Sequence, residues 1–520
     1  MNTIHNLPQS IQQAAQRFPA KVAFRCLREE VSYGELAQQV QQLASVLRQS
    51  GVKKGDCVGI FMARSLETAV AMYGIMAAGA IYVPINPQQP NERINFILAE
   101  CQIKILLTNA GQRRRLRPLF KIQNSLTLVI GSPIELPVAT LTWAEVYTQE
   151  IDSIDIPILE DDPAYILYTS GSTGTPKGIL HTHRSGLAYA KLAIETYDLT
   201  EKDVIGNHAP IYFDISTLGY FAASLVGAST IIASEAHVKM PVSLAELLEK
   251  ENITVWYSVP LALRQMLERG KLAERKLPAL RLVIFAGELF PTKHLRATMQ
   301  TLPQATFCNA YGPTETNVCT NFFLHSPPKY DRPISIGQTW NNTEILILND
   351  EDEVVNNSEK GELLVRSSTL MQGYWNRPDL NEKVFLFKKM NDSCVAKFYR
   401  TGDLVSLQAD GNLTFYGRKD RQIKTRGYRV ELDEITNTLL QHEAIAEAAV
   451  YTILDAEGEN SLAASVLLKK GTTLEQQEIM QFLKQKLLWY AVPQQVRIVE
   501  QLPRTATGKI DLKQLQVHNS

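Results

Sequence analysis

Tyr168-Thr169-Ser170-Gly171-Ser172-Thr173-Gly174-Thr175-Pro176-Lys177-Gly178 is the stretch that decides the fold of this chain. Apolar residues 164–167 precede it and Ile179-Leu180 follows it, which predicts a buried strand, a loop of small residues and a second strand. Glycines and small hydroxyl residues let a polyphosphate approach the backbone N–H groups, and Lys177 supplies a cation. The spacing is not that of a Walker A loop, because the four-residue gap and the Lys-Ser/Thr ending are missing. A flexible surface loop is the alternative for such a composition.

The length of 520 residues is too great for one compact core, so we expect two or more domains. The apolar fraction of 45% and the charged fraction of 21% are typical of a soluble globular enzyme. A net charge of −1 gives no reason to expect nucleic acid or an anionic membrane as a partner. We interpret the arginines at 113–115 and 117 as part of a solvated loop.

Targeting and redox features predict a cytoplasmic protein. The six cysteines are scattered, with no CxxC pair and no histidine at ligand spacing, which favours a reduced compartment without structural zinc. Residues 1–16 lack the charged and apolar regions of a signal peptide. Residues 68–85 are long and apolar enough to suggest a membrane span, but Gly74, Gly79 and Pro84 interrupt them. A buried helix followed by a buried strand explains this segment better.

The first half of the chain has the pattern of a parallel α/β sheet. We expect an amphipathic helix over residues 11–18, and a second helix that runs to about Leu47. Ser32 lies three residues before Glu35, which is the capping-box pattern of a helix start. Strands then alternate with helices as far as residues 230–232.

The composition of the segments changes late in the chain. Residues 361–365 and 404–415 read as short alternating strands of a small β-rich part. A compact α+β piece follows residue 420, with a helix over Leu432–Leu440 and strands near 448–452 and 463–468. We therefore place a domain boundary between Gly417 and Arg421.

Several further stretches resemble motifs of the adenylate-forming superfamily, particularly the amino-acid-activating domains of nonribosomal peptide synthesis. Together with the signature loop they extend over residues 31–515 in the order that the family shows. The further stretches are Ala78-Gly79-Ala80-Ile81-Tyr82-Val83-Pro84, Phe213-Asp214-Ile215-Ser216, Asn309-Ala310-Tyr311-Gly312-Pro313-Thr314-Glu315, Gly361-Glu362-Leu363, Tyr399-Arg400-Thr401-Gly402-Asp403, Gly417-Arg418 with Asp420, and Thr507-Gly508-Lys509.

The resemblance implies an α/β multidomain fold. Residues 1–417 would form a large N-terminal adenylation core of α/β subdomains with a small β-barrel-like part. Residues 418–420 would form a hinge, and residues 421–520 a small mobile α+β domain. The chain departs from the family at Ile85-Asn86-Pro87, where Leu-Asp-Pro is common, and at Ala286-Gly287-Glu288, where Gly-Gly-Glu is common. Neither departure affects a catalytic role.

The same resemblance assigns an ATP site. In this chemistry a carboxylate attacks the α-phosphate of ATP and magnesium pyrophosphate leaves, so catalysis is mainly electrostatic positioning. Glu315 is the expected Mg²⁺ ligand, since a carboxylate oxygen suits that ion. Asp403 would accept hydrogen bonds from the ribose hydroxyls, and residues 309–311 would surround the adenine. The expected ATP-binding residues are Thr169, Ser170, Gly171, Ser172, Thr173, Gly174, Lys177, Asn309, Ala310, Tyr311, Gly312, Thr314, Asp403 and Arg418.

Lys509, with Thr169 and Glu315, completes the expected catalytic set. Its ammonium group can bridge carboxylate and α-phosphate oxygens, and Gly508 lets the backbone bend into the site. A solvated charge near the terminus is the alternative for a lone lysine. In the family the small domain then rotates, so that a pantetheine thiol reaches the acyl-adenylate. By resemblance Asp420 is the hinge residue and residues 424–428 form the loop that moves in.

The expected acyl acceptor is a separate carrier protein. No Gly-Gly-x-Ser phosphopantetheine site follows Lys509 before the last residue, Ser520, and no condensation domain precedes the motifs. The sequence therefore predicts a free-standing ligase, and neither nucleic acid nor a membrane is an expected partner.

The amino-acid substrate is predicted from Asp214. A carboxylate in an otherwise apolar turn is costly unless it is paired, and an α-ammonium group is a fitting partner. A role as helix N-cap is the alternative. Alignment with the family's pocket positions adds further lining residues to Asp214, and Lys509 is the last of these positions. Apart from Asp214 and Lys509, the lining residues are apolar or weakly polar. These residues are Ile215, Leu218, Tyr257, Ile284, Ala286, Ala310, Val318 and Cys319.

This lining is similar to that of stand-alone ligases that load L-proline onto a carrier protein. Valine and phenylalanine are the runners-up, because an apolar pocket discriminates by only ~1–3 kcal/mol per methylene. An acyl- or aryl-CoA ligase and a catalytically inactive scaffold protein are further alternatives. Intact Lys177, Glu315, Asp403 and Lys509 argue against the inactive scaffold.

Overall fold

The computed structural model describes residues 3–121, 125–152, 156–171, 175–391, 393–425, 427–454, 460–504 and 510–517. The chain forms two compact units, a large unit that ends at Gly417 and a small unit that contains Arg418–Ser520. The segments Gln88–Phe96 and Thr169–Lys177 also belong to the small unit, although the sequence-based division assigned both to residues 1–417. Their contacts explain the difference, since Ser170 donates a 3.0 Å hydrogen bond to the carbonyl of Arg429 and Arg93 forms a 2.6 Å ion pair with Glu434.

The first sheet of the large unit has the strand order β19-β9-β8-β4-β3-β5-β6-β7 within the described residues. Parallel pairing joins β8 to β4, β4 to β3, β3 to β5, β5 to β6 and β6 to β7, as the alternation of strands and helices predicted. The strands are β3 (Cys57–Phe61), β4 (Ile81–Pro84), β5 (Ile105–Thr108), β6 (Leu128–Ile130), β7 (Ala139–Leu141), β8 (Pro163–Thr169), β9 (Lys177–Thr182) and β19 (Gly373–Tyr374).

The second sheet has the order β16-β15-β14-β13-β12-β10-β11-β1-β2. Its central strands β10 to β14 run parallel, so their carboxyl ends meet at one edge, and this edge positions the candidate site. The strands are β1 (Val22–Cys26), β2 (Glu29–Ser32), β10 (Val204–Asn207), β11 (Ser229–Ile232), β12 (Val255–Ser258), β13 (Leu282–Phe285), β14 (Thr306–Tyr311), β15 (Thr320–Leu324) and β16 (Gln338–Thr339).

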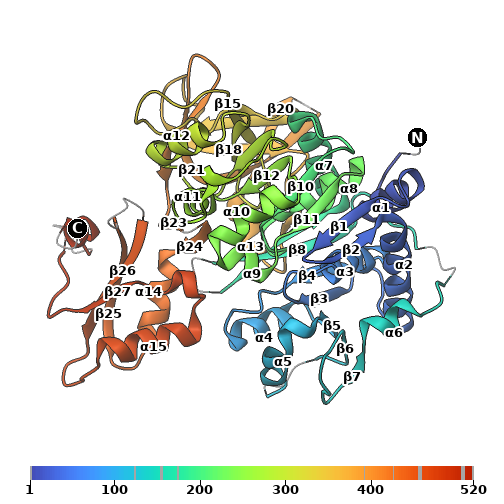
Figure 1. The fold of residues 1–520 in the computed structure, drawn as a ribbon. Coiled ribbons are helices and arrows are strands. Elements are labelled where there is room, and N and C mark those ends of the chain that lie inside the picture. The colour runs from blue at the N-terminus through green and yellow to red at the C-terminus, as the bar shows by residue number, and fades with distance from the viewer. Residues whose placement is uncertain are drawn as a thin grey trace. The chain divides into compact units, whose positions relative to one another are not determined.

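Helices of the large unit pack around these sheets (Figure 1). Most of the buried apolar side chains of α1, α2, α3, α7 and η3 share one hydrophobic core with the first strands of both sheets. The helices are α1 (Leu7–Arg17), α2 (Tyr33–Gln49), α3 (Glu67–Ala77), α4 (Asn91–Glu100), α5 (Arg113–Leu119), α6 (Trp143–Tyr147), α7 (His183–Tyr197), α8 (Ala223–Val226), α9 (Glu235–Lys239), α10 (Pro241–Lys250), α11 (Pro260–Arg269), α12 (Thr292–Thr301), α13 (Pro378–Val384) and the short turns η1 (Ala110–Gln112), η2 (Asp214–Ser216), η3 (Leu218–Ala222) and η4 (Leu272–Glu274).

The local sequence signals account for several of these elements. Ser32 and Glu35 form the predicted capping box of α2, and residues 68–85 form α3 followed by β4. Helix α1 begins four residues earlier than predicted, because Asn6 accepts a hydrogen bond from Gln9 in a capping box of its own. The prediction of a solvated loop over residues 113–117 is wrong, since they form helix α5 with Leu116 and Leu119 buried.

The predicted β-rich part is a five-stranded antiparallel sheet with the order β17-β18-β21-β20, and β22 pairs with β21. Strand β21 is longer than predicted and spans Cys394–Leu407. The other strands are β17 (Thr343–Leu348), β18 (Gly361–Ser367), β20 (Phe385–Asn391) and β22 (Leu413–Arg418). No helix in the part of the chain that the structure describes is both long and apolar enough to cross a membrane.

The small unit is α+β, as predicted. A hairpin of β23 (Gln422–Thr425) and β24 (Tyr428–Glu431) leads into helix α14, which covers Leu432–Leu440 as the sequence predicted. A three-stranded sheet of β25, β26 and β27 packs with α14 and α15 around one apolar core. The remaining elements are β25 (Ile445–Leu454), β26 (Asn460–Leu468), α15 (Gln476–Lys486), η5 (Trp489–Ala491), β27 (Gln495–Ile498) and α16 (Leu512–Val517).

Candidate active site

Asp214 is the first residue of the short helix η2, just before η3. The N-cap of η2 is Phe213 and no side chain caps this turn, so the interpretation of Asp214 as an N-cap is wrong. The Asp214 carbonyl accepts a 2.5 Å hydrogen bond from Thr217 Oγ1, which accepts a 3.2 Å hydrogen bond from Asn317 Nδ2. Asp214 itself is half-buried, and its negative charge adds to the effect of burial in raising the pKa of the buried Tyr165.

The predicted pocket residues come together at the carboxyl edge of the second sheet. Tyr257 on β12 pairs in register with Ile284 on β13, and Ile284 pairs with Cys308 on β14. One hydrophobic cluster contains Ile215, Leu218, Tyr257, Ile284, Ala286, Ala310 and Val318. Cys319 is also buried but belongs to a neighbouring cluster with Tyr311, whose carbonyl lies 3.5 Å from its Sγ.

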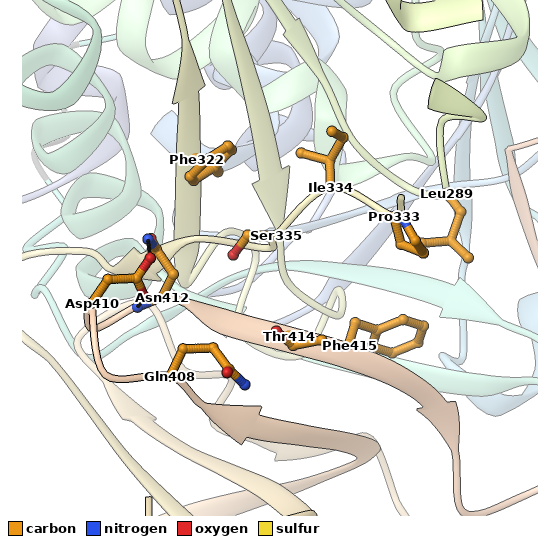
Figure 2. A pocket seen from close by; sticks show the side chains of 10 residues that line it. All are labelled: Leu289, Phe322, Pro333, Ile334, Ser335, Gln408, Asp410, Asn412, Thr414 and Phe415. Atoms are coloured by element: carbon orange, nitrogen blue, oxygen red, sulfur yellow. Dashed lines mark hydrogen bonds between the residues drawn. The ribbon is translucent and has the colours of Figure 1, made fainter. Parts of the chain in front are cut away.

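The predicted adenine residues Asn309, Ala310 and Tyr311 end strand β14. Asn309 Nδ2 donates a 2.8 Å hydrogen bond to the carbonyl of Ser335, and Ser335 lines a cavity of about 210 Å³. Figure 2 shows Leu289, Pro333 and Phe415 on one side of this cavity and Gln408, Asp410 and Asn412 on the other. The residues that line it are Leu289, Phe322, Pro333, Ile334, Ser335, Gln408, Asp410, Asn412, Thr414 and Phe415.

This cavity borders the adenine motif, and the residues that line it were not predicted from the sequence. Leu289 follows Gly287-Glu288 directly, and Phe415 lies on β22, so both were within or next to noted stretches. The alternation of apolar and polar residues in β22 predicted a strand there. It could not predict that this strand lies near β14.

Asp403, the predicted ribose residue, is buried and contacts the adenine motif directly. Its Oδ2 accepts a hydrogen bond from the hydroxyl of Tyr311. Thr401 holds the backbone at this point, since its Oγ1 accepts a 3.0 Å hydrogen bond from the Asp403 N–H and donates a 2.7 Å bond to the carbonyl of Leu363. Two motifs that are 92 positions apart in sequence therefore form one hydrogen-bonded pair.

Glu315, the predicted metal ligand, has a fully buried side chain. Its Oε1 accepts a 2.6 Å hydrogen bond from the hydroxyl of Tyr374. Next to it, His181 Nε2 lies 3.0 Å from the carbonyl of Thr314, and burial lowers the pKa of His181 to about 4. His181 is therefore neutral at pH 7 and donates from Nε2. Tyr374 and His181 were not predicted as site residues, because only the folded chain brings them to the Thr314-Glu315 turn.

The donor set at Glu315 fits a magnesium ion that is shared with a substrate. The described residues contain no group of three or more His, Cys, Asp or Glu side chains that could hold a metal ion by themselves. Mg²⁺ usually takes one or two carboxylates from the protein and completes its shell with phosphate oxygens and water. A single oriented carboxylate is consistent with that mode of binding.

Strand β8 ends at Thr169 and strand β9 begins at Lys177, so the two strands predicted at the ends of the signature stretch are confirmed. The Thr169 hydroxyl is buried and has no hydrogen-bond partner among the residues that the structure describes. A Cβ at Gly171 would lie 2.1 Å from the carbonyl oxygen of Thr175, so only glycine fits there. Lys177 is the first residue of β9. Ser172, Thr173 and Gly174 lie outside the described residues.

Arg418 and Asp420 form a bidentate pair, with Nε–Oδ1 and Nη2–Oδ2 distances that are both 2.7 Å. Burial alone would raise the pKa of Asp420, but the Arg418 guanidinium, the Gln422 N–H and the charge of Arg429 together lower it. The sequence motifs implied separate roles for these residues, in ribose binding and at the hinge, whereas the structure joins them. Arg426 and Lys509 lie outside the described residues.

Comparison with known protein families identifies the chain. Residues 11–375 match the family described as AMP-binding enzyme, and residues 434–509 match the AMP-binding enzyme C-terminal domain. The chain belongs to the AMP-binding enzyme family. The resemblance stated from the sequence motifs is thereby confirmed, and the protein is a ligase of this family.

Relatives of this AMP-binding enzyme include stand-alone and modular proteins. It is 31% identical over 507 residues to the L-proline--[L-prolyl-carrier protein] ligase of Pseudomonas fluorescens, and the match covers 97% of both chains. It is 32% identical over 514 residues to gramicidin S synthase 1 of Brevibacillus brevis, and this match covers 99% of this chain but only 44% of that protein. The Vibrio cholerae adenylation domain AlmE, solved in complex with glycyl-adenosine-5'-phosphate, superposes with a TM-score of 0.83 at 26% identity over 100% and 98% of the two chains.

Proposed function

We propose that this AMP-binding enzyme adenylates L-proline and then transfers the prolyl group to the phosphopantetheine thiol of a separate carrier protein. The observation that carries this proposal is the position of Asp214 among apolar side chains at the carboxyl edge of the second sheet. A half-exposed carboxylate among apolar side chains is stabilised by a positive charge, and the α-ammonium of an amino acid would supply one. The full-length similarity to a proline--carrier protein ligase supports the same substrate and acceptor.

In the first half-reaction, a carboxylate oxygen of the amino acid attacks the α-phosphorus of ATP. The bond between the α-phosphorus and the bridging oxygen breaks, pyrophosphate leaves, and aminoacyl-AMP forms. Asp403, held by Tyr311, would bind the ribose, and Asn309 would contact the adenine next to the cavity of Figure 2. The unpartnered Thr169 hydroxyl would donate to a phosphate oxygen. Lys509 would neutralise charge on the carboxylate and α-phosphate oxygens in the transition state.

Glu315 would hold Mg²⁺, with the Tyr374 hydroxyl fixing the carboxylate in place. The ion would supply neutralising charge for the leaving phosphates. Arg418 would support the ribose as well as pairing with Asp420.

In the second half-reaction, the thiol sulfur attacks the acyl carbon, the bond to AMP breaks, and the thiol proton is released. Asp420 is our proposed hinge residue, and residues 418–420 the proposed hinge between a core of residues 1–417 and a mobile domain of residues 421–520. Lys424 and Thr425 end strand β23 and Tyr428 begins strand β24, and we propose that residues 424–428 approach the thiol. The bidentate bond to Arg418 would have to adjust when the hinge moves, because it joins two of the three hinge residues.

The lining of the pocket supports a small apolar side chain. Ile215, Leu218 and Ile284 offer no charge to a lysine, arginine, aspartate or glutamate side chain, which would be expensive to bury there. Valine and phenylalanine remain the second choices, because an apolar pocket separates similar side chains by only ~1–3 kcal/mol per methylene. An acyl- or aryl-CoA ligase is the alternative reaction, but such acids have no ammonium group for Asp214.

The test is substrate-dependent exchange of labelled pyrophosphate into ATP, with the twenty standard amino acids, a fatty-acid series and aryl acids. We expect L-proline to rank first or second and the acids without an amine to give only background. Activity with fatty or aryl acids alone would refute amino-acid activation. Strong activity with valine or phenylalanine and none with proline would refute only the choice of substrate. Loading of a phosphopantetheinylated carrier protein, followed by mass spectrometry, tests the second half-reaction.

A further inference from the structure

Tyr168 precedes Thr169 at the end of strand β8, and its hydroxyl is held by the C-terminal end of helix α4. The hydroxyl donates a 2.5 Å hydrogen bond to Oε2 of Glu100. Cys101 Sγ lies 3.1 Å from the same hydroxyl oxygen. A phenol has one proton, and that proton goes to Glu100, so the thiol is the donor in the contact with Cys101. Two neighbouring residues thus fix the position of the Tyr168 side chain.

The titration properties of this contact agree with that direction of donation. Burial raises the pKa of Tyr168, and Cys101 and Glu100 add to this effect, so the phenol stays protonated at pH 7. Burial also raises the pKa of Glu100, and the bond from Tyr168 and the charge of Arg377 oppose that rise. The Tyr168 hydroxyl is therefore a permanent donor, and Glu100 is its acceptor.

The other end of the signature stretch is tied to the same end of α4. The main-chain N–H of Trp375 donates a 2.8 Å hydrogen bond to the carbonyl of Gly178. The indole Nε1 of Trp375 donates to the carbonyl of Glu100 at 3.5 Å. A Cβ at Gly178 would lie 3.0 Å from Cζ of Tyr168, so the backbone of β9 packs closely on this ring. Glu100 is thus connected to the strand before the signature loop and to the strand after it.

Thr169 is the residue whose position depends most directly on Tyr168, because it is the next residue of the chain. Its hydroxyl is buried and has no hydrogen-bond partner within the described ranges. Burial without a partner costs the full desolvation of the group, so native proteins rarely leave a hydroxyl unmatched. The direction of this hydroxyl follows from the backbone of β8, and the bond between Tyr168 and Glu100 holds that backbone at its end.

We propose that Glu100 is a positioning residue for ATP, which holds Tyr168 and thereby places the Thr169 hydroxyl against the leaving phosphates. The proposal rests on the ATP-dependent adenylation set out above. Glu100 acts through Tyr168 in this role and touches no substrate atom. Binding of ATP and of pyrophosphate should therefore depend on Glu100, whereas binding of AMP should not, because AMP lacks the two phosphates that leave.

The direct test is Glu100→Ala, with equilibrium binding of ATP and of AMP measured by calorimetry in the absence of an amino acid. We expect the Kd for ATP to rise about 10-fold, because the Tyr168 hydroxyl loses its acceptor, and the Kd for AMP to change less than about twofold. The KM for pyrophosphate in the reverse reaction should rise with the Kd for ATP. Equal weakening of ATP and AMP would overturn the proposal, and so would unchanged binding of both.

Glu100→Gln and Tyr168→Phe test whether the hydrogen bond is responsible. Glutamine keeps an oxygen that can accept from Tyr168, so we expect its Kd for ATP to stay within about threefold of the wild type. Tyr168→Phe should reproduce the ATP-specific loss, and it carries the test if Glu100→Ala does not fold. The double variant should bind ATP no more weakly than either single variant. A glutamine variant as weak as the alanine variant, or losses that multiply to about 100-fold in the double variant, would refute the role of the bond.

Cys101→Ala is the matched control. It removes the other group in contact with the Tyr168 hydroxyl, at the neighbouring position, and retains the carboxylate of Glu100. We expect its Kd values for ATP and AMP to stay within about twofold of the wild type. The same ATP-specific loss in Cys101→Ala would assign the effect to packing at the end of α4, and the proposal would fail. If the wild type binds no ATP, the proposed function has failed; if it binds ATP and Glu100→Ala binds it equally well, only the role of Glu100 has failed.

Discussion

The hydroxyl of Tyr374 donates a 2.6 Å hydrogen bond to Oε1 of Glu315, and both side chains are buried. This bond connects strand β19, at the edge of the first sheet, with the turn after β14 in the second sheet. It fixes the orientation of the carboxylate that we propose as the magnesium ligand. A residue that orients a metal ligand commonly matters almost as much as the ligand itself.

Tyr374→Phe should therefore weaken the response to magnesium. Losing a hydrogen bond to a charged group costs ~1.5–3 kcal/mol, so we expect kcat/KM for ATP to fall about 10- to 100-fold. The Mg²⁺ concentration that gives half-maximal exchange should rise, and titration of the exchange reaction with MgCl₂ measures it. Tyr33→Phe is the control, since it removes a buried tyrosine hydroxyl that donates to the carbonyl of Ala228. An unchanged magnesium titration in Tyr374→Phe would contradict the assigned role of Glu315.

Asp403→Asn should reduce the recognition of the ribose. The carboxylate accepts from Tyr311 and, by our proposal, from ribose hydroxyls, and an amide is a weaker acceptor for both. We expect the KM for ATP to rise about 10-fold, with little change in the KM for the amino acid. The wild type should discriminate ATP from 2'-deoxy-ATP or 3'-deoxy-ATP, and the variant should lose most of that discrimination. Equal discrimination in the two proteins would show that Asp403 does not bind the ribose.

Lys509→Ala should lower adenylation by several orders of magnitude, because charge on the reacting oxygens then has no counterpart. The unfolding free energy should change little, since a lysine at a reactive centre contributes little to packing. Single-turnover formation of aminoacyl-AMP is the measurement. A variant that keeps more than about a tenth of the wild-type rate, a loss below ~1.4 kcal/mol, would refute the catalytic role.

Asp214→Ala should raise the KM for the amino acid strongly and leave the KM for ATP nearly unchanged. The variant removes the charge that we pair with the α-ammonium. It retains the hydrogen bond from the Thr217 hydroxyl to the main-chain carbonyl of residue 214. Initial rates over both substrate concentrations, together with thermal unfolding, separate binding from folding. A lower melting temperature with unchanged kinetics would assign Asp214 a purely structural role.

Acid should destabilise the large unit through its buried histidines. The pKa of His181 falls from the ordinary 6.5 to about 4, and that of His183 also falls to about 4, both because burial disfavours the charged form. The unfolded chain thus binds more protons than the folded one below pH 6.5, so stability falls as the pH decreases from 6.5 towards 4. Each histidine contributes about 1 kcal/mol of this loss between pH 6.5 and pH 5.5.

Thermal unfolding between pH 7.5 and 5.0 measures this effect. His181→Gln retains polar groups that can bond the Thr314 carbonyl but has no proton to take up, so its stability should depend less steeply on pH than that of the wild type. Parallel stability curves for the two proteins would show that His181 does not contribute.

The sequence was a good guide wherever the signal was local. The Ser32–Glu35 capping box and the helix at Leu432–Leu440 depend on residues three or four apart, and both were predicted correctly. Helix α5 was missed because four arginines dominate its composition and only Leu116 and Leu119 mark its buried face. Strand β21 was predicted too short, since its first residues are exposed and lack an apolar alternation.

The candidate site residues also differ in how far the sequence could predict them. The order of the motifs names Asp214, Glu315 and Asp403 as candidate site residues, and their roles stay predictions. Tyr374 could not be predicted as a site residue, because it is identified only by its hydrogen bond to Glu315, which is distant in sequence and close only after folding.

The contacts of Trp340 with two tyrosines have a consequence for engineering: Tyr189 stacks on its ring, and Tyr197 meets it edge-on. Attempts to change the amino-acid preference usually replace the side chains that face the substrate. In this enzyme those side chains share one hydrophobic core with Trp340 and both tyrosines, and a close-packed core yields little to a larger neighbour. Grafting the pocket of a relative that accepts a bulkier amino acid would therefore require the three aromatic residues to be exchanged with it.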